Sequence, residues 1–576
     1  MITDDVVVER DLTARMRDGT ILRADVYRPA RGGPYPALVL RTPYDKAIAQ
    51  TSAYAHPAWY ARHGYVVVVQ DVRGRFRSDG TFVPFASEAE DGNDTVRWAA
   101  QLTGTTGQVA LYGFSYAGVA GYMAAAETPP ELCCAALACA SPDLCDGWIY
   151  RGGALQLAFA LHWFVDLLAI PEAEARGLRG RAQGLVGIVS DLQRRSLREP
   201  LITLAAEHLD ELQPLLAWLP AEPHCSGLLC PPLRDLERIR IPILNIGGWF
   251  DCFAKGTVAS HETIITNAPD SRLIMGPWFH APWTQLVGER DFGVSAVSKV
   301  DHWQLAWFDW WLKSEGSPAG GLPRARVFVM GSQEWHDLHD WPPAGVSEQT
   351  WFLHSDGGAA HAADGKLDVQ EPGDEIPDVF VFEPRNPVPT HGGTWLGVDE
   401  ATSAGVREQS IIAARTDVAV YTSPALSDDL EILGTASLLL FAATDAASSD
   451  WVAKIVDVHP GGQSFNVCDG IQRVVRRKAT EMSQLVVPGE PYECEIRFAP
   501  TAHRFKAGHQ VRLHLANSDF PQFDVNCGNG SQSGGGIPSY ARPVTQVIYH
   551  QTSRESRLVL PTTNKVLGEE YVPTSV

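Results

Sequence analysis

Basic residues are scarce in this 576-residue chain, which holds 47 lysines and arginines against 68 aspartates and glutamates. The resulting net charge of -21 disfavours contact with phosphate-rich surfaces, so it argues against binding to nucleic acid or to anionic membranes. It favours solubility and says little about a small neutral substrate. The ten cysteines are too few in so long a chain to resemble the disulfide framework of a small secreted domain, and they suit a reducing compartment.

Long hydrophobic runs are also missing. The most apolar stretch runs from Ala154 to Ile170. It is shorter than a typical membrane span and contains Gln156, His162 and Asp166, so it predicts a buried helix. The first eleven residues carry charges where a signal peptide needs an apolar core. We therefore expect a cytoplasmic protein without membrane insertion. No internal repeat is evident, and the sequence leaves a homodimer open.

A complete metal-binding pattern is lacking as well. His224, Cys225 and Cys230 invite a zinc interpretation, but a structural zinc site takes four ligands and no second pair at ligand spacing accompanies them. We therefore expect no metal site.

What the sequence does hold is a tight turn that presents a serine. Val109 to Tyr112 form the apolar run of a central strand, and Tyr116 to Glu127 are rich in small helix formers. Between them Gly113 and Gly118 allow the strand and the helix to approach closely, with Ser115 on the turn. This pattern is typical of the nucleophile elbow of an α/β hydrolase.

The match to that pattern is shifted by one residue. The second glycine usually stands two residues after the serine, whereas here Ala117 holds that place and Gly118 follows. A glycine-bounded turn around an ordinary serine gives a similar sequence, so the motif needs support. A serine hydroxyl is a poor nucleophile at neutral pH, and catalysis also requires a histidine base and a carboxylate that orients it.

Two later segments supply these partners in the expected order. Ile239 to Ile246 predict a buried strand that leads to Asp251, and Ser271 to Gly276 predict a short strand that leads to His280. In an α/β hydrolase the acid and the base follow the serine in this order, each on a loop after the carboxyl end of a strand. We therefore predict Ser115 as nucleophile, His280 as base and Asp251 as orienting carboxylate.

Each of these residues also has an ordinary interpretation, as a turn former, helix cap or solvated side chain. His162 and His302 are weaker rivals for the base. The segment from Val300 to Leu312 has apolar residues at helical spacing, so His302 is expected on an amphipathic surface helix.

An oxyanion hole needs hydrogen-bond donors aimed at the developing negative charge. The backbone N–H of Tyr116 follows the nucleophile and is the first donor. The second is expected from a loop after an early strand. Pro36 to Arg41 predict such a strand, and Pro43 stiffens the turn that presents Tyr44.

Several independent motifs resemble the family of bacterial cocaine esterase, which also contains α-amino acid ester hydrolases and X-Pro dipeptidyl-peptidases. They occur in the right order over nearly the whole chain: Arg41-Thr-Pro-Tyr44-Asp-Lys46, Gln70-Asp-Val-Arg-Gly74, Gly113-Phe-Ser-Tyr-Ala-Gly118, Gly248-Trp-Phe-Asp251, Gly276-Pro-Trp-Phe-His280, Asn386-Pro-Val-Pro-Thr-His-Gly-Gly393 and Val467-Cys-Asp-Gly-Ile471. The resemblance implies that Ser115 is acylated, with His280 as base and Asp251 as its partner. It also implies that the Tyr44 hydroxyl joins the Tyr116 N–H in the oxyanion hole, and no cofactor is needed.

The length predicts about three domains, because it exceeds what one core usually holds. Strand and helix signals alternate over residues 1–144 and return over 241–350, which together predict an α/β-hydrolase domain. Leucine- and alanine-rich helical segments over 145–240 predict an inserted helical cap. Short β-rich runs over 351–576 predict an all-β domain, and the family resemblance makes it a jelly roll.

The residues after Asp251 bear on the substrate. In α-amino acid ester hydrolases this loop carries extra carboxylates that can pair with a substrate ammonium group, whereas here Cys252-Phe-Ala254 follow. This favours esters with an uncharged, apolar or aromatic acyl group. Four residues match the family's acyl pocket, with ordinary core packing as the alternative: Trp148, Trp163, Phe253 and Leu396. Gly397 departs from the pattern, which points to a wider pocket.

Two alternatives stay open at this point. Hydrolysis of amine-bearing substrates, as by α-amino acid ester hydrolases or X-Pro dipeptidyl-peptidases, requires a carboxylate cluster that the sequence does not reveal. A catalytically dead protein that binds through its jelly roll requires Ser115 to be unreactive.

Overall fold

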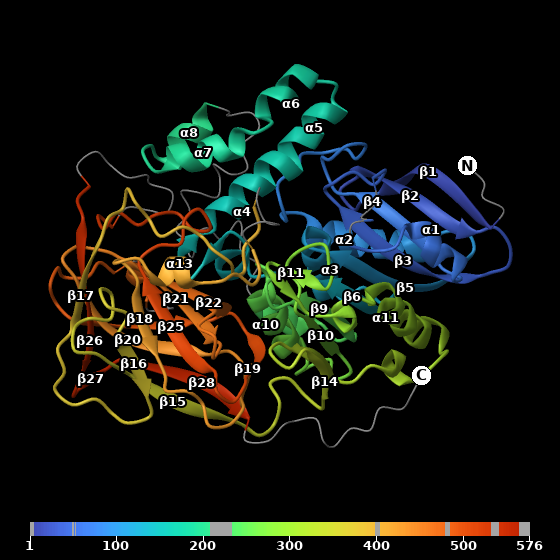
Figure 1. Cartoon of the computed structure of the whole chain (residues 1–576). Coiled ribbons are helices and arrows are strands. Elements are labelled where there is room, and N and C mark those ends of the chain that lie inside the picture. Colours follow the sequence, from blue (N-terminus) through green and yellow to red (C-terminus); the bar gives the residue numbers. More distant parts are fainter. Residues whose placement is uncertain are drawn as a thin grey trace.

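The computed structural model describes residues 5–48, 51, 53–207, 233–397, 404–477, 484–530 and 541–563. Within them the chain forms two large sheets that lie side by side, with helices projecting above their junction (Figure 1). His224, Cys225 and Cys230 lie outside the described residues, as does most of the glycine-rich segment 528–536. No helix in the described part of the chain is both long and apolar enough to cross a membrane.

The amino-terminal sheet is built around a parallel centre. The strands from β4 to β13 in its spatial order run parallel, whereas β1, β2 and β14 pair antiparallel at the two edges. In spatial order the ten described strands are β1 (Val6–Arg15), β2 (Ile21–Pro29), β4 (Val66–Asp71), β3 (Tyr35–Thr42), β5 (Thr105–Phe114), β6 (Leu132–Ala138), β9 (Ile243–Gly248), β10 (Arg272–Gly276), β13 (Ala325–Val329) and β14 (Glu334–Leu338).

Both faces of this sheet are covered, which explains why its central strands read as continuous apolar runs. Along β4, Val66 and Val68 pack into one core with α2 (Glu88–Ala100) and α3 (Tyr116–Ala126). The alternate residues Val67 and Val69 pack into a second core with α1 (Pro57–Arg62) and α11 (Val300–Phe308). The remaining elements of this region are α10 (Ala254–Ile264), β11 (Leu286–Val287), β12 (Arg290–Asp291), η4 (Val294–Ala296), η5 (Asp309–Lys313) and η6 (Pro318–Gly321).

A mainly helical segment interrupts the sheet between β6 and β9. In Figure 1 its helices α5 to α8 lie above the two sheets, and α4 descends between them. The elements are η1 (Leu144–Trp148), β7 (Tyr150–Arg151), β8 (Ala154–Leu155), α4 (Leu157–His162), η2 (Trp163–Ala169), α5 (Ile170–Ala175), α6 (Arg179–Leu185), α7 (Ile188–Ser196), α8 (Leu201–Ala206) and η3 (Leu233–Arg238). The expectation of a buried helix over 154–170 is confirmed for α4 and most of η2, whose aromatic and aliphatic side chains are buried.

The carboxyl-terminal region is dominated by β-strands, and among its described residues the strand pairs are antiparallel except β16 with β18. The strands are β15 (Val346–His354), β16 (Gly365–Asp368), β17 (Asp378–Phe382), β18 (Ala419–Thr422), β19 (Leu430–Gly434), β20 (Ser437–Thr444), β21 (Asp450–Val458), β22 (Ser464–Arg473), β23 (Tyr492–Arg497), β24 (Thr501–Phe505), β25 (Gln510–Ala516), β26 (Val544–Gln551), β27 (Arg554–Glu555) and β28 (Arg557–Thr563). Short helical turns are α13 (Ser410–Ala413) and η7 (Val474–Arg476).

A buried histidine in this β region makes stability depend on pH. His514 in β25 is 2% exposed, and neither ring nitrogen has a partner among the described residues. Burial, aided by the charges of Arg512 and Lys454, lowers its pKa to about 3. The unfolded chain therefore takes up a proton near pH 6.5 that the folded chain rejects. We expect the free energy of unfolding to fall by about 1.4 kcal/mol per pH unit from this group as the pH drops below about 6.5.

Urea unfolding at pH 7.5 and pH 5.0 measures this dependence. In His514→Leu the loss of stability between the two pH values is expected to be smaller than in the wild type by about 2 kcal/mol. His361→Ala, which removes an exposed histidine of the same region, serves as the control and should leave the dependence unchanged. Equal losses in the wild type and in His514→Leu would contradict this account.

Candidate active site

Ser115 occupies the turn between β5 and α3 in a strained conformation, with φ 60° and ψ -125°. Two glycines make the turn possible. A Cβ on Gly113 would lie 2.3 Å from the carbonyl oxygen of Ala117, and one on Gly118 would lie 2.7 Å from Cβ of Ala140. The second glycine is thus needed where α3 crosses the chain after β6, which explains its displacement by one residue. The predicted strand, turn and helix are confirmed.

The strand ends bring two distant side chains to the serine. β9 and β10 pair in parallel with Gly248 opposite Gly276, so the loops that follow them leave the same edge of the sheet. His280 Nε2 lies 3.1 Å from Ser115 Oγ, and His280 Nδ1 lies 2.9 Å from Asp251 Oδ1. Ser115 and His280 are each 7% exposed and Asp251 is fully buried. The order serine, histidine, carboxylate is the arrangement that catalysis by an activated serine requires.

The surroundings of Asp251 keep its carboxyl group ionised. Burial alone would raise its pKa, but the His280 ring, a hydrogen bond from the Cys139 thiol and the Phe253 N–H together lower it below the usual value. The Cys252 thiol is also 3.5 Å from Oδ1. A charged carboxylate at this place holds the Nδ1 proton on His280 and leaves Nε2 to accept the proton of Ser115.

Tyr44 and Tyr116 reach the same place from different elements. The Tyr44 hydroxyl accepts a hydrogen bond from Trp163 Nε1 at 2.9 Å. Burial raises the pKa of Tyr44 strongly, and hydrogen bonding with Trp163 and Ser115 offsets this only in part, so the phenol keeps its proton and can donate it. The Tyr116 N–H belongs to the first turn of α3, where N–H groups have no acceptor within the helix. Its side chain is anchored by a 2.8 Å hydrogen bond to Glu88.

Arg75 fixes the loop that carries Tyr44, a role that sequence reasoning missed. It is buried, and its Nε donates to the carbonyl oxygen of Pro43 at 2.9 Å. The same guanidinium donates to the carbonyl oxygen of Leu168 and pairs with Glu172 at 3.0 Å, so it joins this loop to the helical segment above it. Arg75 stands just beyond the Gln70 to Gly74 motif, and no local spacing connects it to Tyr44.

The predicted pocket residues converge beside the histidine. The Trp148 and Phe253 rings stack with centroids 4.3 Å apart, and the Phe253 ring lies edge-on to His280 at 5.3 Å. Trp163 meets Trp148 edge-on at 5.4 Å. These three residues and Leu396 are buried in one apolar cluster and pack as core residues do. Their role in lining an acyl pocket stays a prediction.

Gly397 does not widen this cluster. A Cβ at Gly397 would lie 2.5 Å from the Trp395 ring and 3.2 Å from Cβ of Ala158. The space that the glycine leaves is therefore filled by the Trp395 side chain, which is 5% exposed. The expectation of a wider pocket is not supported by this packing.

The rival histidines lie elsewhere. His162 Nδ1 is 2.7 Å from Asp166 on the next helical turn. His302 is exposed on α11, where the predicted helix is confirmed, and its ring lies 5.8 Å from that of Trp59.

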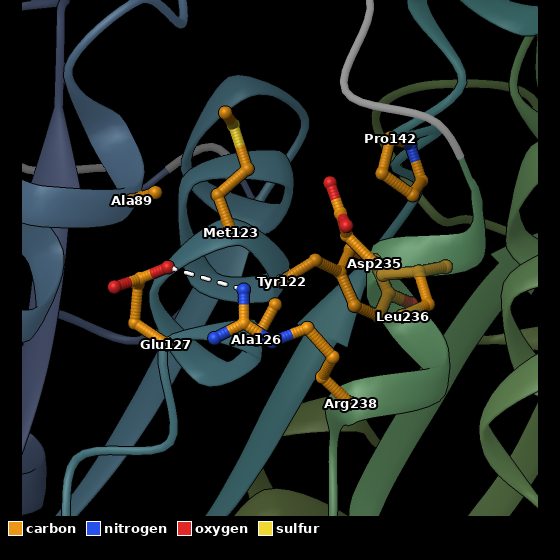
Figure 2. A pocket seen from close by; sticks show the side chains of 9 residues that line it. All are labelled: Ala89, Tyr122, Met123, Ala126, Glu127, Pro142, Asp235, Leu236 and Arg238. Carbon is orange, nitrogen blue, oxygen red and sulfur yellow. Dashed lines mark hydrogen bonds and ion pairs between the residues drawn. The ribbon is translucent and has the colours of Figure 1, made fainter.

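Figure 2 shows a separate surface hollow, whose lining includes none of Ser115, His280 and Asp251. It is formed between the last turns of α3 and η3, and the Glu127–Arg238 pair at its rim is 3.5 Å apart. Its lining residues are Ala89, Tyr122, Met123, Ala126, Glu127, Pro142, Asp235, Leu236 and Arg238. This set offers no activated nucleophile, so the chemistry belongs to the cluster around Ser115.

Comparison with known proteins establishes the family of the chain. Residues 18–282 match the family described as X-Pro dipeptidyl-peptidase (S15 family), and residues 319–559 match the X-Pro dipeptidyl-peptidase C-terminal non-catalytic domain. Cocaine esterase from Rhodococcus sp. (strain MB1 Bresler) is 32% identical over 92% of this chain and 94% of its own length. The chain belongs to the S15 hydrolase family.

Other relatives extend the comparison. A putative serine esterase from Mycobacterium bovis is 23% identical over 95% of this chain and 94% of its own length. Among solved structures, an aminopeptidase from a marine sediment Thaumarchaeota archaeon has a TM-score of 0.82 at 22% identity, over 97% of each chain. An α-amino acid ester hydrolase has a TM-score of 0.78 at 22% identity, over 98% of each chain. These structures share the fold. The chain thus shares its family with proteins named as esterases.

Proposed function

We propose that Ser115, His280 and Asp251 form the catalytic triad of an esterase that acts on small esters with an uncharged, apolar or aromatic acyl group. The 3.1 Å and 2.9 Å contacts that join the three side chains carry this proposal. Ser115 attacks the ester carbonyl while His280 Nε2 takes its proton, and the same histidine then protonates the leaving alcohol. Water activated by His280 cleaves the acyl-serine in the second half of the cycle.

The oxyanion of both steps is stabilised by the Tyr44 hydroxyl and the Tyr116 N–H. A phenol held in its protonated form by burial is a donor at neutral pH, and the Tyr116 N–H adds the positive end of the α3 dipole.

The charges around the aromatic cluster support an uncharged acyl group. Two carboxylates of the described helical segment pair with cations, because Asp146 lies 2.5 Å from Lys255 and Glu172 lies 3.0 Å from Arg75, while Asp166 contacts the His162 ring. Binding a substrate ammonium group would require a carboxylate whose charge is not balanced in this way.

The boundaries predicted for the domains and the jelly-roll topology remain proposals. We take 1–144 with 241–350 as the catalytic domain, 145–240 as its cap and 351–576 as a jelly roll, which the dominance of antiparallel strands supports.

A small panel of substrates tests the proposed specificity: 4-nitrophenyl acetate, a 4-nitrophenyl benzoate, an amino acid methyl ester with a free amine, and an Ala-Pro anilide. We expect higher kcat/KM on the two neutral esters. Higher values on the substrates with a free amine would contradict the acyl-group proposal and leave the triad standing. The absence of turnover on the whole panel in a folded protein would favour the binding-protein alternative.

Removing the Tyr44 hydroxyl is expected to weaken the transition state without disturbing the fold. In Tyr44→Phe the Trp163 N–H loses its acceptor and the oxyanion loses one donor, so kcat should fall by about 10²- to 10³-fold with a small change in KM. Steady-state kinetics on 4-nitrophenyl acetate measures this. Tyr122→Phe, which removes a phenol that donates to Asn245 at 2.6 Å in the core, is the matched control. Unchanged kcat in Tyr44→Phe would remove Tyr44 from the oxyanion hole.

A further inference from the structure

A second cluster of histidines surrounds a buried aspartate in the β region, outside the triad. Asp457 is the penultimate residue of strand β21, and its side chain is 5% exposed. His509 Nδ1 lies 2.8 Å from its Oδ1, His503 Nε2 lies 3.2 Å from its Oδ2, and His459 Nε2 lies 3.6 Å from the same oxygen. Three imidazoles therefore face one buried carboxylate, whose two oxygens offer about four lone-pair sites.

Three of these residues have the geometry of a metal site. One ligand atom from each of Asp457, His459 and His509 lies within 4.8 Å of the others, and the two histidine rings are 4.4 Å apart. Bonds of about 2.0–2.2 Å to zinc place tetrahedral ligand atoms about 3.3 Å apart, so small side-chain rotations would suffice. We propose that Asp457, His459 and His509 bind one divalent transition-metal ion of the Zn²⁺ class.

The backbone holds these ligands in place. Asp457 pairs with Val511 across β21 and β25, and His509 immediately precedes β25. His459 follows the end of β21, where its N–H donates to the carbonyl oxygen of Gln463 at 2.8 Å. Ligands on paired strands and a tight turn need little reorganisation when an ion binds.

His503 has the position of a supporting residue. Its Nε2 faces the Asp457 oxygen, and its side chain is 9% exposed. Its Nδ1 is buried without a partner in the described part of the chain. A hydrogen bond from Nε2 would orient the Asp457 carboxylate toward an ion.

The nature of the ligands selects the kind of ion. Two imidazole nitrogens and one carboxylate oxygen suit zinc, cobalt or nickel, whereas calcium and magnesium prefer oxygen ligands. The Arg290 guanidinium, which lies over the Phe465 ring at 5.7 Å, opposes a cation, and the buried Asp457 charge offsets it.

A small hollow adjoins these side chains. It is lined by Asp457, His459 and His503 from the β region and by Phe250 and Met330 from the amino-terminal region. Phe250 immediately precedes Asp251, and Met330 pairs with His503 in an isolated bridge. The hollow therefore lies where the β region contacts the part of the chain that carries the triad carboxylate.

Titration of the chelator-treated protein with ZnCl₂ in a calorimeter tests the proposal. We expect saturable binding of one ion per chain, and a tetrahedral d–d spectrum when Co²⁺ replaces Zn²⁺. His459→Phe keeps a ring against Phe465 and should weaken binding by at least about 100-fold, as should His509→Asn. His503→Asn should weaken it by about 10- to 100-fold.

Two controls make the outcome decisive. His361→Ala removes an exposed histidine of the same region and should leave the affinity unchanged, and Ser115-dependent ester turnover without metal shows that each variant is folded. Binding of one ion that persists in both His459→Phe and His509→Asn would place the ion elsewhere and overturn the proposal. The absence of saturable binding by the wild type would also overturn it, leaving a set of histidine–aspartate pairs.

Discussion

Ser115→Ala is expected to lower kcat on 4-nitrophenyl acetate by about 10⁵- to 10⁶-fold, because the acyl group then has no residue to receive it. Direct attack by water on the ester would then be promoted only by the oxyanion donors and by the binding of the ester. The turn itself should survive, since alanine can take the place of a serine whose hydroxyl faces His280. A folded protein with almost no turnover is the expected result.

The matched control is Ser260→Ala. Ser260 is a fully buried serine on α10 that donates to the carbonyl oxygen of Gly256 at 2.7 Å, so its loss should cost stability and leave kcat near the wild-type value. Mass spectrometry after rapid quenching should find the acyl group on the peptide that contains Ser115. Turnover in Ser115→Ala within tenfold of the wild type would show that another nucleophile carries the reaction.

The strand ends explain why so much of the site was predictable. Buried parallel strands appear in the sequence as short apolar runs. The polar residues that follow their carboxyl ends lie at one edge of the sheet. The segments before Asp251 and His280 follow this rule. One boundary was wrong: the predicted strand from Ile239 begins at Ile243 in the structure, and Ile239 instead closes the turn after η3. Pro242 cannot donate to a strand ladder and delays the start.

Other features depend on contacts between segments far apart in the chain. The hydrogen bonds of Arg75 to Pro43 and Leu168 span 32 and 93 residues, and no periodicity in the sequence encodes them. The contact between Cys139 and Asp251 likewise joins residues far apart in the chain. Cys139 also has a φ of 46°. The apolar strand that ends at Ala138 does not predict this left-handed conformation.

The aromatic residues show that a match to a family's motif does not establish that a side chain lines a pocket. Trp148, Trp163 and Phe253 were predicted to line a pocket, and the structure does bring them together beside His280. Whether side chains enclose a space or fill it depends on every neighbour, and Gly397 illustrates this because Trp395 takes the room that it leaves. The residue type alone predicts burial better than it predicts a cavity.

Asp251→Asn is expected to lower kcat by about 10³- to 10⁴-fold with little change in KM. Asp251 Oδ1 accepts from His280 Nδ1 and from the Phe253 N–H. An asparagine that places its oxygen there keeps both hydrogen bonds and loses the negative charge. One that places its NH₂ group there opposes two donors and turns His280 to the wrong tautomer. In both cases the imidazolium formed during attack lacks its counter-charge in a buried site.

Asp378→Asn separates this effect from the general cost of neutralising a buried aspartate. Asp378 is also fully buried and lies 3.1 Å from a histidine, His550, but it belongs to the β region away from Ser115. Asp378→Asn should lower the urea concentration at the midpoint of unfolding and leave kcat close to the wild-type value. Asp251→Asn should instead lower kcat with little change in KM. If Asp251→Asn kept full kcat, the proton of His280 Nδ1 would have to be held by another acceptor, and Asp251 would not be the third member of the triad. A parallel loss of kcat in both variants would instead mean that the assay reports on stability, because only one of the two carboxylates contacts the histidine that bonds to Ser115.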